Sequence, residues 1–118
     1  MARLVLLRDG VGIHSYPLHE QPLTIGRHAD SVVRLNDPAV SLNHARITAQ
    51  PDPYLDGHTE VTLEDLGSTN GTLVNDEAVS RQVLRDGDHI RIGRYEFSYD
   101  ADEADTLDRT VIYLPDQD

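Results

Sequence analysis

Arg27 and Ser41 are residues of the types that bind phosphate. A phosphate held by a protein requires a planar guanidinium, hydroxyl donors and backbone N–H groups, which replace the hydrogen bonds that the anion loses with water. Arg27 follows Gly26, and a glycine lets the backbone turn or approach another segment closely, so the guanidinium is expected to project from a loop. Ser41 lies in a loop before a predicted strand, and its hydroxyl can donate to a phosphate oxygen. Taken singly, each also fits an ordinary role, as a solvated surface arginine and a turn hydrogen bond.

His44 follows Ser41 by three residues and starts the next predicted strand. Three roles are open to it: phosphate ligand, catalytic base, or neutral histidine that ties a loop down. A hydrolytic Ser41–His44 pair is disfavoured because no Gly-x-Ser-x-Gly elbow surrounds the serine. The histidines are scattered, without the spacing of a metal site such as His-Glu-x-x-His, and no nucleotide-binding glycine loop is present. We therefore expect a binding protein with no catalytic residue, no metal and no cofactor, and not an enzyme.

Residues 65–72, Asp-Leu-Gly-Ser-Thr-Asn-Gly-Thr, are the most informative stretch of the chain. The Asn70-Gly71 pair predicts a two-residue hairpin, because both residue types tolerate positive φ. Asn75 predicts a second turn. The three motifs together, Gly-Arg, then Ser-x-x-His, then Ser-Thr-Asn-Gly, are far more specific than any one alone. With them the sequence closely resembles the forkhead-associated (FHA) family over roughly residues 4–99.

The resemblance implies an all-β fold, an FHA-like β-sandwich of two mostly antiparallel twisted sheets with ligand loops at one end. It also implies that the domain reads phosphothreonine in partner proteins. Four residues would contact the ligand: Arg27, Ser41, Thr69 and Asn70. Three would hold the loops: Gly26, His44 and Gly71. In the family, the residue matching Thr69 offers its hydroxyl to the phosphate, and the one matching Asn70 bonds the peptide backbone.

Leu42 departs from the family pattern. The residue after the motif serine is often polar or basic in this family and reaches the peptide or phosphate, whereas here it is apolar. The chain therefore lacks one donor at the rim of the predicted site. This predicts weaker binding or partly apolar recognition of the peptide.

The elements that must position these residues read as short strands separated by turns. Apolar and β-branched segments predict strands at 3–8, 12–17, 22–26, 32–35, 44–50, 60–63, 72–74, 89–92 and 95–99. In the segment 44–50, Ala45, Ile47 and Ala49 alternate with polar residues, which predicts a strand with one buried face. Short strands at this spacing favour a β-sandwich.

The charge of the chain excludes several classes of partner. Its 118 residues contain ten basic and twenty-one acidic side chains, for a net charge of −11. Such acidity argues against nucleic acid and against an anionic membrane surface, both of which favour basic proteins. There is no cysteine, and no apolar run is long enough for a membrane span or a signal peptide. A cytoplasmic location is expected.

Residues 1–99 are predicted to form the FHA-like domain, and residues 100–118 an acidic tail or linker. Thr106 and Thr110 lie in this acidic segment and are candidate phosphorylation sites. If phosphorylated, the tail could occupy its own binding site or a neighbour's, giving self-association; an inert linker is the alternative. The expected partners are phosphothreonine-containing proteins, substrates of a Ser/Thr kinase. A phospho-independent structural or oligomerisation module, with Leu42 in an apolar contact patch, is the competing function.

Overall fold

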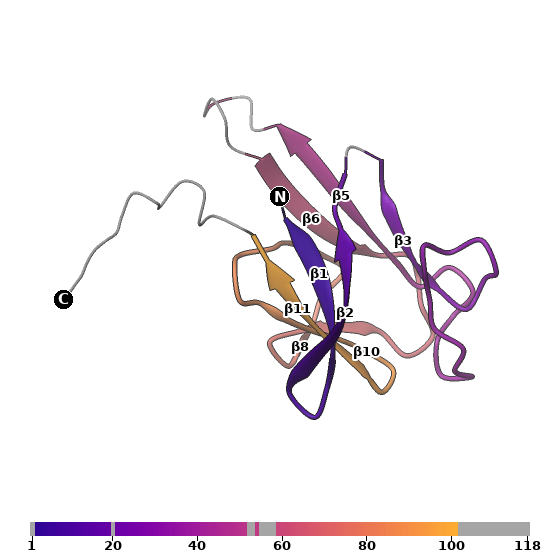
Figure 1. Cartoon of the computed structure of the whole chain (residues 1–118). Coiled ribbons are helices and arrows are strands. Elements are labelled where there is room, and N and C mark those ends of the chain that lie inside the picture. Colours follow the sequence, from indigo (N-terminus) through magenta and orange to yellow (C-terminus); the bar gives the residue numbers. More distant parts are fainter. Residues whose placement is uncertain (1, 20, 52–53, 55–58, 102–118) are drawn as a thin grey trace.

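Two β-sheets face each other in the computed structural model, which describes residues 2–19, 21–51, 54 and 59–101 (Figure 1). The first sheet has the strand order β2-β1-β11-β10-β7-β8. Its strands are Val11–Pro17, Arg3–Arg8, Tyr95–Asp100, His89–Ile92, Thr72–Val74 and Glu77–Ala78. The second sheet has the order β4-β3-β5-β6-β9. Its strands are Val33–Arg34, Leu23–Gly26, Ala45–Pro51, Thr59–Asp65 and Arg81–Val83.

Neighbouring strands pair antiparallel, except β3 and β4, which run parallel. The all-β fold predicted from the sequence is confirmed: the described residues form strands, turns and irregular segments, with no helix. No described segment is therefore a candidate for a membrane-crossing helix.

The core lies between the two sheets and follows from the alternation of side chains along each strand. Ala45 and Ile47 on β5 are buried, as their alternation with polar residues predicts, and they pack in one cluster with residues of the opposite sheet. The largest fully buried side chains are Phe97, Leu4, Ile25, Ile47, Leu63, Ile90 and Ile92. Because both sheets contribute to this cluster, the sandwich gives the loops at its ends a fixed support.

The hairpin expected at Asn70-Gly71 is wrong. β6 belongs to the second sheet and β7 to the first, so the chain crosses between sheets at residues 66–71 instead of turning back. Gly71 has φ +86°, but Asn70 is not among the residues with positive φ. A two-residue hairpin instead lies at Asn75 and Asp76, with φ values of 51° and 70°, between β7 and β8. The turn predicted at Asn75 is therefore confirmed.

Strands β8 and β9 escaped the sequence prediction. Both are short, and their residues are exposed, so they carry no alternation of apolar and polar residues that a pattern could reveal. β9 pairs with β6 and extends the second sheet by one edge strand. This pairing places Arg81 opposite Glu64 on the second sheet.

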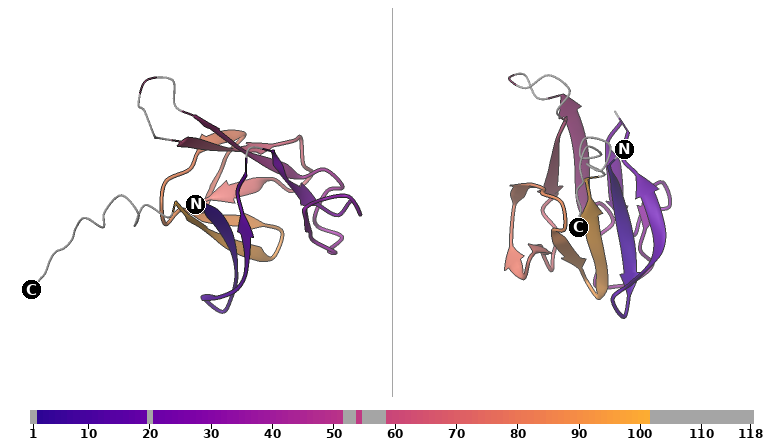
Figure 2. Two further views of the ribbon diagram at one scale, coloured as in Figure 1. Left: turned by 45° about the horizontal axis from the view of Figure 1, so that its top comes forward. Right: turned by 60° about the vertical axis from the view of Figure 1, so that its left-hand side comes forward.

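The register of the second sheet brings three chain segments to one end. Ile25 on β3 pairs with Ala45 on β5, and Ala45 pairs with Asp65 on β6. The end of β3, the start of β5 and the end of β6 therefore lie side by side, at the right of Figure 1 and again in the left view of Figure 2. The candidate tail with Thr106 and Thr110 lies outside the described residues, so the domain boundary stays a prediction.

Candidate functional site

Three loops meet at this end of the second sheet: residues 27–32, 35–44 and 66–71. Backbone hydrogen bonds join them. The amide of Arg27 donates to the carbonyl of Ser41 at 3.0 Å, and the amide of His28 donates to the carbonyl of Leu42 at 3.2 Å. The amide of Leu66 donates to the carbonyl of His44 at 2.9 Å. Residues far apart in sequence are thus fixed next to one another by backbone contacts alone.

Gly26 lies where two backbones touch. A Cβ atom at this position would stand 2.1 Å from the carbonyl oxygen of Leu42 and 2.9 Å from its carbonyl carbon. The glycine is buried, and the neighbouring group is backbone, which cannot swing away as a side chain can. The close approach of β3 to the 35–44 loop therefore depends on the absence of a side chain at residue 26.

One edge of the Arg27 guanidinium is hydrogen-bonded to the described part of the protein, and the other edge is not. Its Nε donates to the carbonyl of Val40 at 2.8 Å. None of the residues that the structure describes accepts a hydrogen bond from its two terminal amino groups, and the residue is exposed. A guanidinium oriented in this way presents two parallel N–H donors, the arrangement that suits a phosphate or carboxylate.

Ser41 joins two of the loops through its hydroxyl. Its Oγ accepts a hydrogen bond from the amide of Thr69 at 3.0 Å. Because the oxygen acts as acceptor there, the hydroxyl proton stays available for another acceptor. The segment that carries Thr69 is therefore placed directly beside the Ser41 hydroxyl, and Ser41 itself lies beside Arg27 through the backbone bond described above.

His44 is completely buried beneath these loops. Its Nδ1 lies 3.1 Å from the amide nitrogen of Ser41, which can only donate, and its Nε2 lies 2.9 Å from the carbonyl oxygen of Gly71, which can only accept. These partners require the neutral ring with its proton on Nε2. Both ring nitrogens are hydrogen-bonded to loop backbone, which corresponds to the loop-tying role. No ring nitrogen is left to bind phosphate or to act as a catalytic base.

Thr69 and Asn70 lie at the exposed tip of the 66–71 loop. The Asn70 side-chain amide donates to the carbonyl of Ala39 at 2.8 Å, which bridges the tip to the 35–44 loop. Within the described part of the chain, nothing hydrogen-bonds to the Thr69 hydroxyl or to the Asn70 side-chain oxygen. Both loops therefore leave hydrogen-bonding groups open to a ligand.

Asp65 organises the 66–71 loop, a role that the sequence motif alone did not reveal. Its carboxylate accepts from the amides of Gly67 and Ser68 at 3.1 and 3.0 Å, and from the hydroxyls of Ser68 and Thr72 at 2.5 and 2.8 Å. The Ser68 hydroxyl in turn accepts from the Gly71 amide at 2.9 Å. Partial burial acts to raise the pKa of Asp65, but these hydrogen bonds from Ser68 and Thr72 outweigh it and lower the pKa below its usual value. An aspartate two residues before a glycine in a turn was the available signal.

Replacing Asp65 with asparagine is expected to destabilise the domain by roughly 1–2 kcal/mol at pH 7. Asparagine has one side-chain oxygen, so it cannot accept both from the amides of Gly67 and Ser68, which share one carboxylate oxygen, and from the hydroxyls of Ser68 and Thr72, which share the other. The folded pKa is lowered, so the stabilisation from the charge is complete above the unfolded pKa of about 3.9 and is lost as the pH falls through the lower folded pKa. Urea unfolding of both proteins from pH 7 to pH 2 should give stabilities that converge below about pH 4. A constant difference over this range would contradict the assignment.

An ion pair between Asp37 and Arg94 connects the 35–44 loop to the first sheet. The carboxylate of Asp37 is buried; it accepts from the amide of Ala39 at 2.9 Å and from Nε of Arg94 at 3.1 Å. Arg94 lies in the turn between β10 and β11, where Gly93 packs against Val40. The 35–44 loop is therefore anchored to both sheets.

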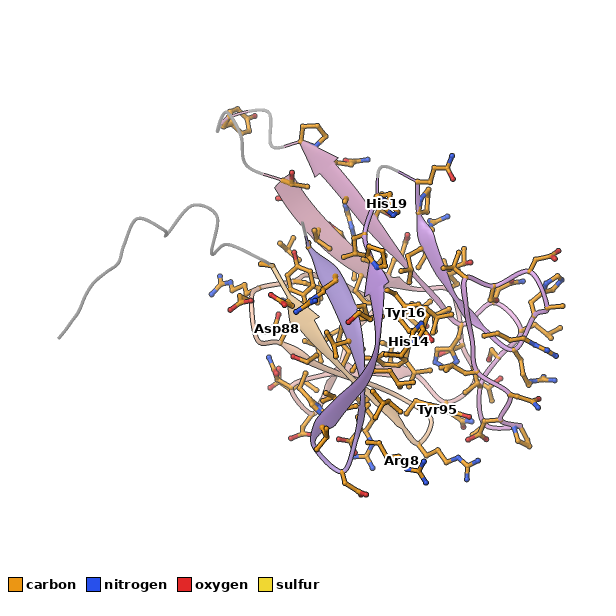
Figure 3. The ribbon with its side chains drawn as sticks, in the orientation of Figure 1. Arg8, His14, Tyr16, His19, Asp88 and Tyr95 are labelled. Carbon is orange, nitrogen blue, oxygen red and sulfur yellow. The ribbon has the colours of Figure 1, made fainter. Side chains whose placement is uncertain are left out.

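His14 and His19 lie away from these loops. His14 is on β2, where its ring centroid lies 4.5 Å from that of Tyr16 with the two rings tilted by 59°, and His19 follows that strand (Figure 3). Within the described ranges, no group of histidine and acidic side chains could hold a metal ion.

The family model of the FHA domain matches residues 23–93, the span that contains all three loops and the strands that carry them. The chain belongs to the FHA-domain family. The family resemblance and the β-sandwich architecture predicted from the sequence are both confirmed.

The chain has curated relatives in Mycolicibacterium and Corynebacterium. It is 38% identical over 97 residues to the glycogen accumulation regulator GarA of Mycolicibacterium smegmatis, covering 81% of this chain and 57% of that protein. It is 37% identical over 98 residues to the oxoglutarate dehydrogenase inhibitor of Corynebacterium jeikeium, covering 83% of this chain and 63% of that protein. The FHA domain therefore spans less than two-thirds of the length of these relatives.

Solved FHA structures agree with the fold. The FHA domain of FhaA, complexed with the intracellular domain of Rv3910, is 40% identical with a TM-score of 0.69, over 84% of this chain and 99% of that one. Mycobacterium tuberculosis EmbR, in complex with a low-affinity phosphopeptide, is 36% identical with a TM-score of 0.70, over 85% of this chain and 24% of that one. The MEK1 FHA domain, at 19% identity and a TM-score of 0.77, shares the fold.

Proposed function

We propose that this FHA domain is a phosphothreonine-dependent protein-binding module. Arg27 and Ser41 contact the phosphate, Thr69 adds a second hydroxyl, and Asn70 bonds the backbone of the partner peptide. Gly26, His44 and Gly71 hold the loops in place for them. The domain acts by binding and not by catalysis, in the cytoplasm, on partners that a Ser/Thr kinase has phosphorylated.

The observation that carries this proposal is that hydrogen bonds join the three segments that bear unused donors. Arg27 and Ser41 are joined through their backbones, and Thr69 is joined to the Ser41 hydroxyl. Between them they retain the terminal amino groups of a guanidinium and two hydroxyl protons, which is a donor set suited to a phosphate monoester. The FhaA and EmbR structures support the proposal, because each holds a binding partner, a phosphopeptide in the case of EmbR.

The acidity of the chain does not oppose such a contact. Exposed charges farther apart than about 8 Å are largely screened at physiological ionic strength. A guanidinium in direct contact with phosphate makes a charge-assisted hydrogen bond worth about 1.5–3 kcal/mol. The net charge of −11 is expected to act on association instead, since the distant field does not steer an anionic peptide toward the site.

Leu42 gives the rim of the site an apolar character. Its side chain is 50% exposed, next to the serine proposed to contact phosphate. We propose that it contacts an apolar part of the peptide in place of the missing donor. The same exposure supports the alternative function, an oligomerisation module that needs no phosphate. Light scattering of unphosphorylated protein tests whether such a dimer exists. If a stable dimer is found and the Leu42→Ser variant still forms it, Leu42 is not part of the dimer contact.

Binding to a phosphothreonine-peptide library tests the function. The wild-type domain should bind phosphothreonine peptides and ignore their unphosphorylated counterparts. Phosphoserine versions of the best binders form the matched control, because they carry the same charge without the methyl group. Equal binding of phosphorylated and unphosphorylated peptides would overturn the proposal.

A further inference from the structure

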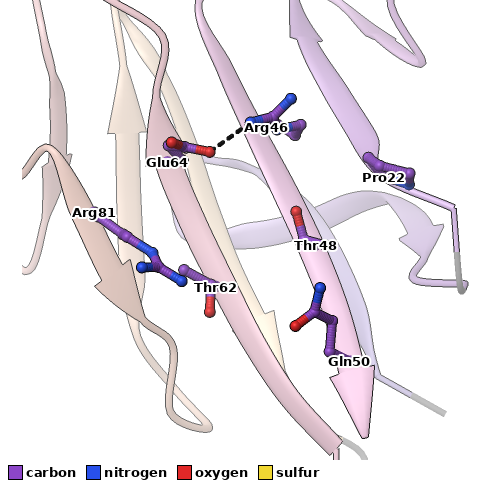
Figure 4. A pocket seen from close by; sticks show the side chains of 7 residues that line it. All are labelled: Pro22, Arg46, Thr48, Gln50, Thr62, Glu64 and Arg81. Carbon is purple, nitrogen blue, oxygen red and sulfur yellow. Dashed lines mark hydrogen bonds and ion pairs between the residues drawn. The ribbon is translucent and has the colours of Figure 1, made fainter.

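The outer face of the second sheet carries a row of charged side chains close to the phosphate site. Arg46 on β5 pairs with Glu64 on β6, and Glu64 pairs with Arg81 on β9. Residues directly opposite each other in antiparallel strands lie on the same face, so these three side chains form one row across the sheet. We call Arg46, Glu64 and Arg81 the cross-strand row (Figure 4).

The cross-strand row borders an open groove of about 350 Å³. Its other lining residues are short polar side chains and one proline: Thr48, Thr62, Gln50 and Pro22. This face makes no contribution to the core, since the buried residues of β5 and β6 point the other way. The groove is polar and open, and side chains of the neighbouring antiparallel strands β5, β6 and β9 line it, which suits an extended peptide segment.

One carboxylate cannot satisfy the two guanidiniums of the row. Arg46 donates one N–H to Glu64 at 2.6 Å, with both side chains about 40% exposed. Within the described part of the chain, Arg81 has neither an ion-pair partner nor a hydrogen-bond acceptor for its guanidinium, and in Figure 4 it extends over Thr62. Glu60, the next acid on this face of β6, stands four residues away, about 13 Å along the strand. The half of the face nearest the site therefore has a local excess of positive charge on an acidic protein.

The row is within reach of a peptide held at the phosphate site. Arg46 follows His44 by two residues of extended chain, about 7 Å, and β9 lies two strands from β5, about 10 Å across the sheet. A peptide extended from the phosphothreonine covers about 3.3 Å per residue. Residues about two to five positions from the phosphothreonine can therefore lie over the row.

We propose that the outer face of the second sheet is a second contact surface for the same phosphothreonine segment, and that Arg46 and Arg81 there bind acidic residues of its flank. The inference rests on the proposed function and adds to it the chemistry of the partner: an acidic stretch beside the phosphothreonine. Guanidinium groups with free donors recognise carboxylates in paired hydrogen bonds, which gives selectivity as well as affinity. Exposed pairs of this kind contribute modestly and depend on salt.

Paired peptides test the proposal. One phosphothreonine sequence is made with three glutamates, and again with three glutamines, at positions two to five on either flank. Wild-type protein should prefer one glutamate version over its glutamine counterpart by at least about threefold at low salt. Arg81→Ala should reduce that preference, the Arg46→Ala and Arg81→Ala double variant should abolish it, and both should leave binding of the glutamine peptides unchanged. Arg91→Ala, an exposed arginine on β10 of the other sheet, is the matched control and should keep the preference.

Two results are distinguishable from success and from each other. Equal binding of glutamate and glutamine peptides by the wild type, or equal losses for both in the Arg81→Ala variant, would overturn this inference and leave the proposed function standing. Failure of every phosphorylated peptide to bind better than its unphosphorylated form would overturn the proposed function and the inference with it.

Discussion

Replacing Arg27 with alanine is expected to weaken phosphopeptide binding at least about 25-fold. Truncating one partner of a hydrogen-bonded charge pair costs about 2–5 kcal/mol, and each 1.4 kcal/mol is a factor of about ten in affinity. Isothermal titration of wild type and variant with the same phosphothreonine peptide measures the loss. The effect is expected in affinity and not in folding, because among the described residues this exposed side chain makes one hydrogen bond, from its Nε to the carbonyl of Val40.

Arg27→Lys and Arg91→Ala separate the geometry from the charge. Lysine keeps the positive charge but has no planar pair of N–H donors and cannot keep the Nε contact to Val40, so it should recover only part of the lost affinity. Arg91→Ala removes the same charge on β10 of the other sheet, and this variant should bind as the wild type does. Equal binding by wild type and Arg27→Ala would refute the role assigned to Arg27.

Two sets of groups divide the work at this site. One set is consumed inside the protein: both nitrogens of His44, the carboxylates of Asp37 and Asp65, and the amide of Asn70 all bond to loop groups. The other set makes no hydrogen bond to the residues that the structure describes, and we propose that it binds the ligand: the terminal nitrogens of Arg27 and the hydroxyl protons of Ser41 and Thr69. A site whose internal bonds are made before the ligand arrives loses less conformational entropy on binding.

The strands with one buried face could be predicted from the sequence, and the connections between the sheets could not. Alternation of Ala45 and Ile47 with polar residues shows which side of β5 is buried. This pattern is contained in consecutive residues, so the sequence of the segment is enough to predict it. Asn70-Gly71 carries the strongest local signal for a hairpin, yet the chain crosses to the other sheet there. Burial of the flanking strands in different sheets overrides the turn preference of two residues.

The residues that we propose contact the ligand are easier to anticipate than the residues that hold them. Arg27, Ser41 and Thr69 stand in motifs whose residue types suggest phosphate chemistry. The contact between Asp37 and Arg94 joins residues separated by 57 positions, and no local pattern indicates it. The cross-strand row has the same character, because Arg46, Glu64 and Arg81 become neighbours only once the register of three strands is known.

Replacing Gly26 with alanine is expected to destabilise the domain more than a glycine-to-alanine change at a position with room for the added methyl group. The new Cβ would stand 2.1 Å from the carbonyl oxygen of Leu42, and relief requires the 35–44 loop to move away from β3. Overpacking of a well-packed site costs typically about 1–3 kcal/mol, which lowers the melting temperature of a domain of this size by roughly 5–20 °C. The same movement stretches the backbone bonds from Arg27 to Ser41 and from His28 to Leu42, so peptide affinity should fall together with stability.

Gly10→Ala is the matched control for this effect. Gly10 has φ +81° but nothing within 4 Å of its added Cβ, so alanine in this turn between β1 and β2 tests backbone strain without a collision, outside the three loops. That variant should lose about 1–2 kcal/mol of stability and keep its peptide affinity. Thermal melting and peptide titration of both variants decide the question. A Gly26→Ala protein that melts and binds as the wild type does would mean that the two backbones are not in contact, and the loop that presents Ser41 would need another means of support.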